Sequence, residues 1–180
     1  MPNFFSSLLK RPVFFIIILF AAIAAAPSAI PAQQTKAAAP AAAPIPAQLL
    51  SAKKAFVSNA GTDAMSRAAL VDKQMDVNSA YNQFYAAINN WKRFDLVSAP
   101  ADADLVLEIS FTSPESDCGR GECADAQLTL VVYDARTHFR LWTFSEGIEA
   151  AILAGTWKKN FSSAVDSLIS DFQQLANPQS

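Results

Sequence analysis

The chain has two cysteines, Cys118 and Cys123, in one loop that also contains two glycines. In an oxidising compartment, two cysteines this close in sequence most often pair. A redox-active pair would have shorter spacing and sit at a helix start, and a metal site would need more ligands than the surrounding sequence supplies. The sequence therefore predicts a structural disulfide. An alternative hypothesis is a stiffened loop that presents Arg120 and Glu122 to a partner.

His138 is the single histidine, so a Ser-His-Asp or Cys-His catalytic arrangement would have to use it. It falls in a predicted hairpin turn, where side chains are usually exposed. No Gly-x-Ser-x-Gly segment marks a nucleophilic serine, the acids near the cysteines lack calcium-loop spacing, and residues 59–63 lack the pattern of a phosphate-binding loop. We therefore expect no catalytic, cofactor-binding or metal-binding residues, and a protein that is not an enzyme.

Arg140, Trp142 and Phe144 alternate along one predicted strand. If helices cover the face that holds Leu141, these three side chains lie on the open face of the sheet. Aromatic rings among polar residues are typical of a recognition surface, so we interpret them, with Arg120, as candidate partner-binding residues. The alternative is that the rings wrap a sheet edge or pack under the following loop.

Hydrophobic periodicity predicts the elements that would position these residues. Period-two alternation at 104–112 puts Leu105, Leu107, Ile109 and Phe111 on one side. Spacings of three and four predict amphipathic helices, the last of which we expect to begin after an Asn160 N-cap. Residues 65–75 fit neither pattern, and 59–61 are expected to be a turn that closes the first strand. The predicted strands are 54–58, 94–97, 104–112, 127–134 and 139–146, and the helices are 77–91 and 161–176.

These elements predict an α+β fold: a two-layer sandwich with a mainly antiparallel sheet of four or five strands and two helices on one face. The order is one strand, a helix, four strands and a helix. Because a helix joins the first two strands, we expect them to pair in parallel. The folded domain is expected at 51–180.

The N-terminus has the three parts of a secretory signal peptide. Lys10 and Arg11 precede an unbroken apolar run at 13–26, which is followed by small residues. The run is shorter than the ~20 residues that span a bilayer, so we expect a cleaved signal at 1–32 and an alanine- and proline-rich disordered linker at 33–50. The alternative is an uncleaved inner-membrane anchor facing the periplasm.

The formal net charge of the 180-residue chain is −2. The expected mature part is more acidic still, because the signal carries two cations. A general nucleic-acid binder needs a basic face, so we expect no nucleic-acid partner.

Several segments resemble, in order, uncharacterised exported bacterial proteins. These are Ala80–Tyr85, Trp91–Val97, Ala101–Leu107, Val132–Asp134 and Leu141–Trp142, followed by an amphipathic helix. More distantly, the chain is similar to small envelope accessory domains of the TolB N-terminal and CsgG-like type. The resemblance covers about residues 53–176 and implies a fold and a compartment, but it brings no active-site residues. Unlike the lipoprotein relatives, this chain has no cysteine directly after its apolar run that could be lipidated.

We therefore expect a periplasmic or secreted, non-enzymatic accessory or binding module of the cell envelope. Its partner would be an envelope protein or a cell-wall component, and it would contact a membrane only through a retained N-terminal segment. The alternatives are a small exported hydrolase whose site forms only in three dimensions, and a purely structural envelope protein.

Overall fold

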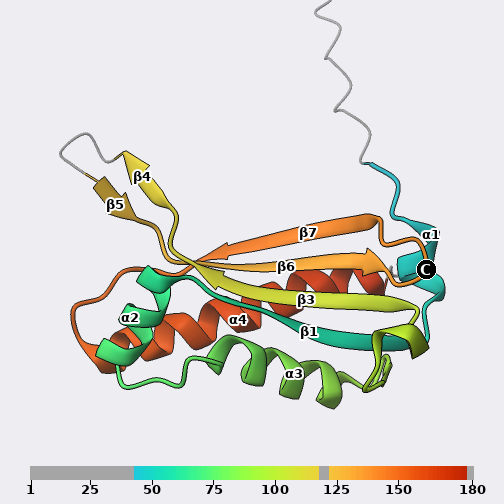
Figure 1. Ribbon diagram of the computed structural model, residues 1–180, viewed down its shortest axis with the longest axis horizontal. Helices are drawn as coiled ribbons and strands as arrows, with labels where there is room; N and C mark the ends of the chain where they lie inside the picture. The colour runs from blue at the N-terminus through green and yellow to red at the C-terminus, as the bar shows by residue number, and fades with distance from the viewer. Residues whose placement is uncertain (1–42, 118–121, 178–180) are drawn as a thin grey trace, which may run out of the picture. The chain divides into compact units, whose positions relative to one another are not determined.

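The computed structural model describes residues 43–117 and 122–177, with 115–117 and 122–124 described by their backbone (Figure 1). The predicted signal peptide and the linker residues up to 42 lie outside these ranges. The described residues belong to one unit, Ala42–Ser180. Its first helix, α1 (Ala47–Ser51), buries Leu49 completely, so the folded part begins before residue 51.

A five-stranded sheet in the order β2-β1-β3-β6-β7 forms one layer of the fold. β1 pairs in parallel with β2 and β3, whereas β3–β6 and β6–β7 are antiparallel. The α+β class is confirmed, as is the parallel pairing of the first two strands. The strands are β1 (Lys54–Thr62), β2 (Asp95–Leu96), β3 (Leu105–Thr112), β6 (Gln127–Asp134) and β7 (Arg140–Gly147).

Helices on one face of the sheet form the second layer (Figure 1). α3 (Ser79–Trp91) contacts β1 and β3, and α4 (Ala154–Ala176) contacts β6 and β7. The shorter α2 (Ala64–Asp72) contacts β3, and a 3-10 helix, η1 (Pro100–Asp102), leads into that strand. Leu105, Leu107, Ile109 and Phe111, which were predicted to share one side of a strand, are buried in the core together with Phe84, Ile88, Leu130, Phe161 and Phe172.

β1 continues through the segment that was expected to be a turn. The register with β3 shifts between Asn59 and Gly61, which marks a β-bulge. The Asn59 side-chain oxygen accepts a hydrogen bond from the Gly61 N–H at 2.9 Å, and Gly61 has φ +92°, a conformation that favours glycine. The turn-forming residues at 59–61 therefore bend the strand without ending it.

α4 begins at Ala154, well before the predicted start at 161. Asn160 is not the N-cap but lies inside the helix, and its amide donates to the carbonyl oxygen of Glu149 at 3.0 Å. The early turns carry Trp157, which is buried against Phe161 and Phe111. One large inward residue in these turns holds the start of the helix on the core, a signal too sparse to show as a periodic stripe.

A two-stranded antiparallel ribbon extends from one end of the sheet (Figure 1). It consists of β4 (Glu115–Asp117) and β5 (Glu122–Ala124), in which Ser116 pairs with Cys123. Cys118 and Arg120 lie outside the described residues. The predicted disulfide and the predicted role of Arg120 therefore stay predictions.

Candidate functional site

Trp142 and Phe144 lie on the helix-covered side of the sheet, not on its open face. Trp142 pairs with the core residue Val132, and Phe144 pairs with the core residue Leu130. The Phe144 ring packs edge-on against Phe172 of α4, with ring centroids 5.9 Å apart. The expectation that these rings point outward is wrong, and the alternative in which they wrap a sheet edge describes their positions.

A bulge at the start of β7 explains why these two rings lie on the helix-covered side and not on the open face of the sheet. Tyr133 pairs with Arg140, but the next residue back, Val132, pairs with Trp142, so Leu141 has no opposite residue on β6. This extra residue reverses the alternation beyond it. Arg140 is exposed on the strand's outer side while both rings turn inward. Partner binding by Arg140, Trp142 and Phe144 stays a prediction.

Asp104 and Asp134 hold backbone at the end of the sheet where β6 turns into β7. One carboxylate oxygen of Asp104 accepts the N–H groups of Lys53 and Lys54 at 2.8 and 2.9 Å. Asp134 accepts the N–H groups of Arg136 and Thr137 at 3.0 and 2.8 Å. These backbone hydrogen bonds hold the pKa of each carboxyl below its ordinary value. Both acids therefore fix the chain rather than present free carboxylates.

Asp63, Ser66 and Ser113 form a clasp between the start of α2 and the residue after β3. Asp63 accepts the Ser66 N–H through one carboxylate oxygen and the Ser113 N–H through the other, each at 2.7 Å. The hydroxyls of Ser66 and Ser113 are 2.7 Å apart and buried. Burial raises the pKa of Asp63, but the amide hydrogen bonds outweigh it and the net shift is downward. The clasp fixes α2 against the sheet.

An apolar groove lies beside α2, at the sheet end from which the β4–β5 ribbon extends. We call it the end groove. Its volume is about 690 Å³, and its walls come from α2, the segment after β7 and the residues that flank the ribbon. Its apolar lining includes Met65, Ala68, Ala69, Ile148, Ala151 and Trp157.

Large aliphatic side chains around the end groove are exposed. Met65, which lines the groove from α2, is 50% exposed, and Ile152 and Leu153, which directly follow the lining residue Ala151, are 94% and 71% exposed. The Lys73 ammonium donates to the Ile152 carbonyl oxygen at 3.4 Å and so links the two walls. Exposed apolar clusters bordered by polar residues are typical of binding surfaces. The end groove is therefore the candidate functional site.

The sequence analysis did not identify this site. Residues 150–154, Ala-Ala-Ile-Leu-Ala, form an apolar run with neither strand nor helix periodicity, and two large aliphatic residues in such a loop are the signal that could have been noticed. The other wall falls within 65–75, which was left unassigned. Two segments far apart in sequence had to be brought together before the groove existed.

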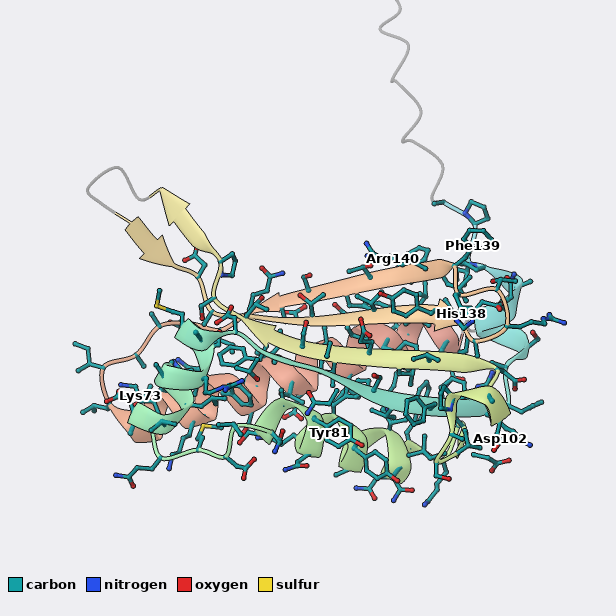
Figure 2. All side chains as sticks on the ribbon, in the orientation of Figure 1. Lys73, Tyr81, Asp102, His138, Phe139 and Arg140 are labelled. Atoms are coloured by element: carbon teal, nitrogen blue, oxygen red, sulfur yellow. The ribbon has the colours of Figure 1, made fainter. Side chains whose placement is uncertain are left out.

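His138, in the β6–β7 turn, lies at the opposite end of the sheet from Lys73 (Figure 2).

Within residues 43–117 and 122–177, no three or more His, Cys, Asp or Glu residues gather as a metal-binding group. No helix in that same part of the chain is long and apolar enough to cross a membrane.

No family model matches the chain, and no curated protein matches it. Among solved structures, it is similar to a PelC dodecamer from Paraburkholderia phytofirmans (17% identity, TM-score 0.39, covering 75% of this chain and 94% of that one). It is also similar to lipoprotein GNA1162 from Neisseria meningitidis, with 16% identity, a TM-score of 0.33 and coverage of 66% of this chain and 99% of that one. A third similar structure is TolB from Acinetobacter baumannii, with 14% identity, a TM-score of 0.33 and coverage of 67% of this chain and 29% of that one.

Proposed function

We propose that the chain is an exported, non-enzymatic binding module of the bacterial cell envelope that holds an apolar segment of a partner protein in the end groove. The observation that carries this proposal is the apolar lining of the groove together with exposed apolar side chains at its walls: Met65 in the lining, and Ile152 and Leu153 directly after the lining residue Ala151. Covering these side chains would remove apolar surface from water at a gain of roughly 25 cal/mol per Å². A few such anchor residues usually carry most of the binding free energy of an interface.

The walls of the end groove are already fixed. The clasp of Asp63, Ser66 and Ser113 holds α2 to the sheet, and Lys73 holds the opposite loop. The buried Trp157 ring packs against Phe111 of the core. A site fixed in advance loses little conformational entropy on binding, which favours recognition of a defined partner.

The described aspartates make structural hydrogen bonds to backbone amides, which favours a binding function over a catalytic one. Asp63, Asp104 and Asp134 accept backbone amides, and His138 lies in an exposed turn away from the groove. A hydrolase would need a nucleophile and a base within hydrogen-bond reach of each other. A purely structural role would not account for the exposed apolar side chains of Met65, Ile152 and Leu153 at the groove.

The proposed export depends on the basic start, the apolar run and the small residues that follow it. Mass spectrometry of the protein isolated from its host is expected to find an N-terminus between Ile30 and Gln33, in the periplasmic or secreted fraction. A mature chain that retains Met1 in the membrane fraction would favour the anchored alternative. An intact chain in the cytoplasm would contradict export.

Site-specific photo-crosslinking in the host tests the groove. A photoreactive amino acid replaces Ile152 at the groove, and in a matched control it replaces Tyr85, which is exposed on α3 (42%). We expect one envelope protein to be crosslinked from position 152 and not from position 85. Equal capture from both positions, or none from 152, would contradict the proposal.

A further inference from the structure

The end of the sheet opposite the end groove has an exposed aromatic residue at its tip. Phe139 follows the β6–β7 turn, and 73% of it is exposed. Figure 2 shows it beside His138 and Arg140 at this end. The backbone beneath it is fixed, because the Phe139 carbonyl accepts the Asp134 N–H at 3.0 Å and the His138 N–H donates to the Asp134 carbonyl at 2.9 Å. A rigid turn therefore holds the ring in solvent.

The turn that carries this ring also carries two arginines, and two lysines lie at the same end of the sheet. Arg136 and Arg140 flank the turn and are exposed, as are Lys53 and Lys54 at the start of β1. Lys53 and Arg136 line one pocket of about 580 Å³. Of the acids in that pocket, Asp104 accepts the lysine amides and Asp134 is buried under the turn.

Two further acids, Asp95 and Asp102, are exposed at the same end of the sheet. Asp95 begins β2, which is the edge strand farthest from β7, and Asp102 ends η1. Figure 2 shows Asp102 apart from Phe139 and Arg140. Asp104 in the pocket is exposed as well, so the basic groups that stand beside Phe139 are the exposed arginines of the turn itself, Arg136 and Arg140.

α1 lies at this same end of the sheet, since it supplies Gln48 and Ser51 to the pocket that Arg136 lines.

We propose that the β6–β7 turn, Arg136–Arg140, docks on the surface of an anionic phospholipid bilayer. The Phe139 ring would enter the headgroup region, where aromatic side chains are favoured, while Arg136 and Arg140 face lipid phosphates. A single ring with two cations gives weak and salt-sensitive binding. The end groove then points away from the membrane. This surface is separate from the groove, so either proposal can fail without the other.

The test uses the expected mature chain, which begins at residue 33, with vesicles and an environment-sensitive fluorescent amino acid at position 139 and, as a matched control, at position 85. We expect a blue shift at position 139 in phosphatidylglycerol vesicles, no shift in phosphatidylcholine vesicles, and reversal by salt. Position 85 should not respond in either vesicle. Because each cation near an anionic surface adds to binding, Arg136→Glu with Arg140→Glu should reduce the shift at least about fivefold. Arg67→Glu with Lys159→Glu, which reverses two exposed cations elsewhere, should leave it unchanged.

An equal shift in neutral vesicles, or at position 85, would overturn the proposal. So would a shift that survives charge reversal at Arg136 and Arg140. A shift that requires an added envelope protein and no lipid would assign the turn to a protein partner instead, and would also overturn it. Crosslinking from position 152 should be unaffected by Phe139→Ser, which separates this outcome from a failure of the end groove.

Discussion

The hydroxyl oxygens of Ser66 and Ser113 lie 2.7 Å apart in the interior, and they join the first turn of α2 to the residue after β3. Asp63 binds the backbone N–H of both serines. Three side chains thus fix one wall of the end groove. The groove depends on this clasp for its shape, and one clasp residue, Ser113, also lines the groove.

Asp63→Ala should destabilise the protein by about 2 kcal/mol at neutral pH, because it removes an N-cap and leaves the Ser113 amide without its acceptor. The pKa of Asp63 is lowered in the folded state, so its contribution is present above the unfolded pKa and is lost as the pH falls through the folded pKa. The cost of the substitution should therefore shrink in acid. Urea unfolding of the wild type and of Asp63→Ala at neutral and acidic pH measures this loss of stability. Asp72→Ala, at the exposed end of the same helix, is the control and should change little.

Phe144→Ala should cost about 2–3 kcal/mol of stability, because the ring packs between the sheet and Phe172. Thr143→Ala, on the exposed side of the same strand, should cost less than about 0.5 kcal/mol. Denaturation curves of both variants give the comparison. A midpoint for Phe144→Ala as high as that of the wild type would mean that the ring is not a packing residue.

Glu146 lies on the helix-facing side of β7, opposite Leu128. Burial raises its pKa, and the nearby Asp171 carboxylate raises it further. A carboxyl with a raised folded-state pKa favours the folded state below its unfolded pKa, and this advantage is lost as the pH rises through the folded pKa. Glu146→Gln should therefore raise the melting temperature at neutral pH and have a smaller effect in acid. A lower melting temperature at neutral pH would show that the charge is stabilised by contacts.

Cys118 and Cys123 are expected to be joined in the exported protein, since two cysteines in one loop pair readily in an oxidising compartment. Thiol labelling of the unreduced protein should find no free cysteine. Labelling after reduction serves as the positive control and should find both. Full labelling before reduction would show that the disulfide is not formed.

Strands and helices with a complete hydrophobic period could be predicted from sequence. β3 and β6 alternate without interruption, and α3 repeats at three and four, so their core faces followed directly. The Leu141 bulge could not be predicted, because alternation alone does not say where an extra residue enters a strand. The early start of α4 was missed because Trp157 is the main inward residue of its first turns.

The end groove was beyond sequence reasoning for a different physical reason. Its walls are α2 and the loop at 148–153, and neither has a periodic apolar stripe facing the core. Val71 and Ile152 are aliphatic but exposed, which contradicts the assumption that large aliphatic residues mark buried positions. A residue whose type conflicts with its exposure can be recognised only in the folded chain.

The crosslinking yield from position 152 in the host, compared between the wild type and Met65→Asp, tests the central claim most directly. Met65 lies on α2, lines the end groove and is half exposed, so a charge there should disturb the groove with little loss of stability. Because the loss of an anchor residue typically costs more than about 1 kcal/mol of binding free energy, we expect the yield to fall about tenfold, with an unchanged urea midpoint. An unchanged yield in Met65→Asp, or the same yield from position 85, would contradict binding in the end groove.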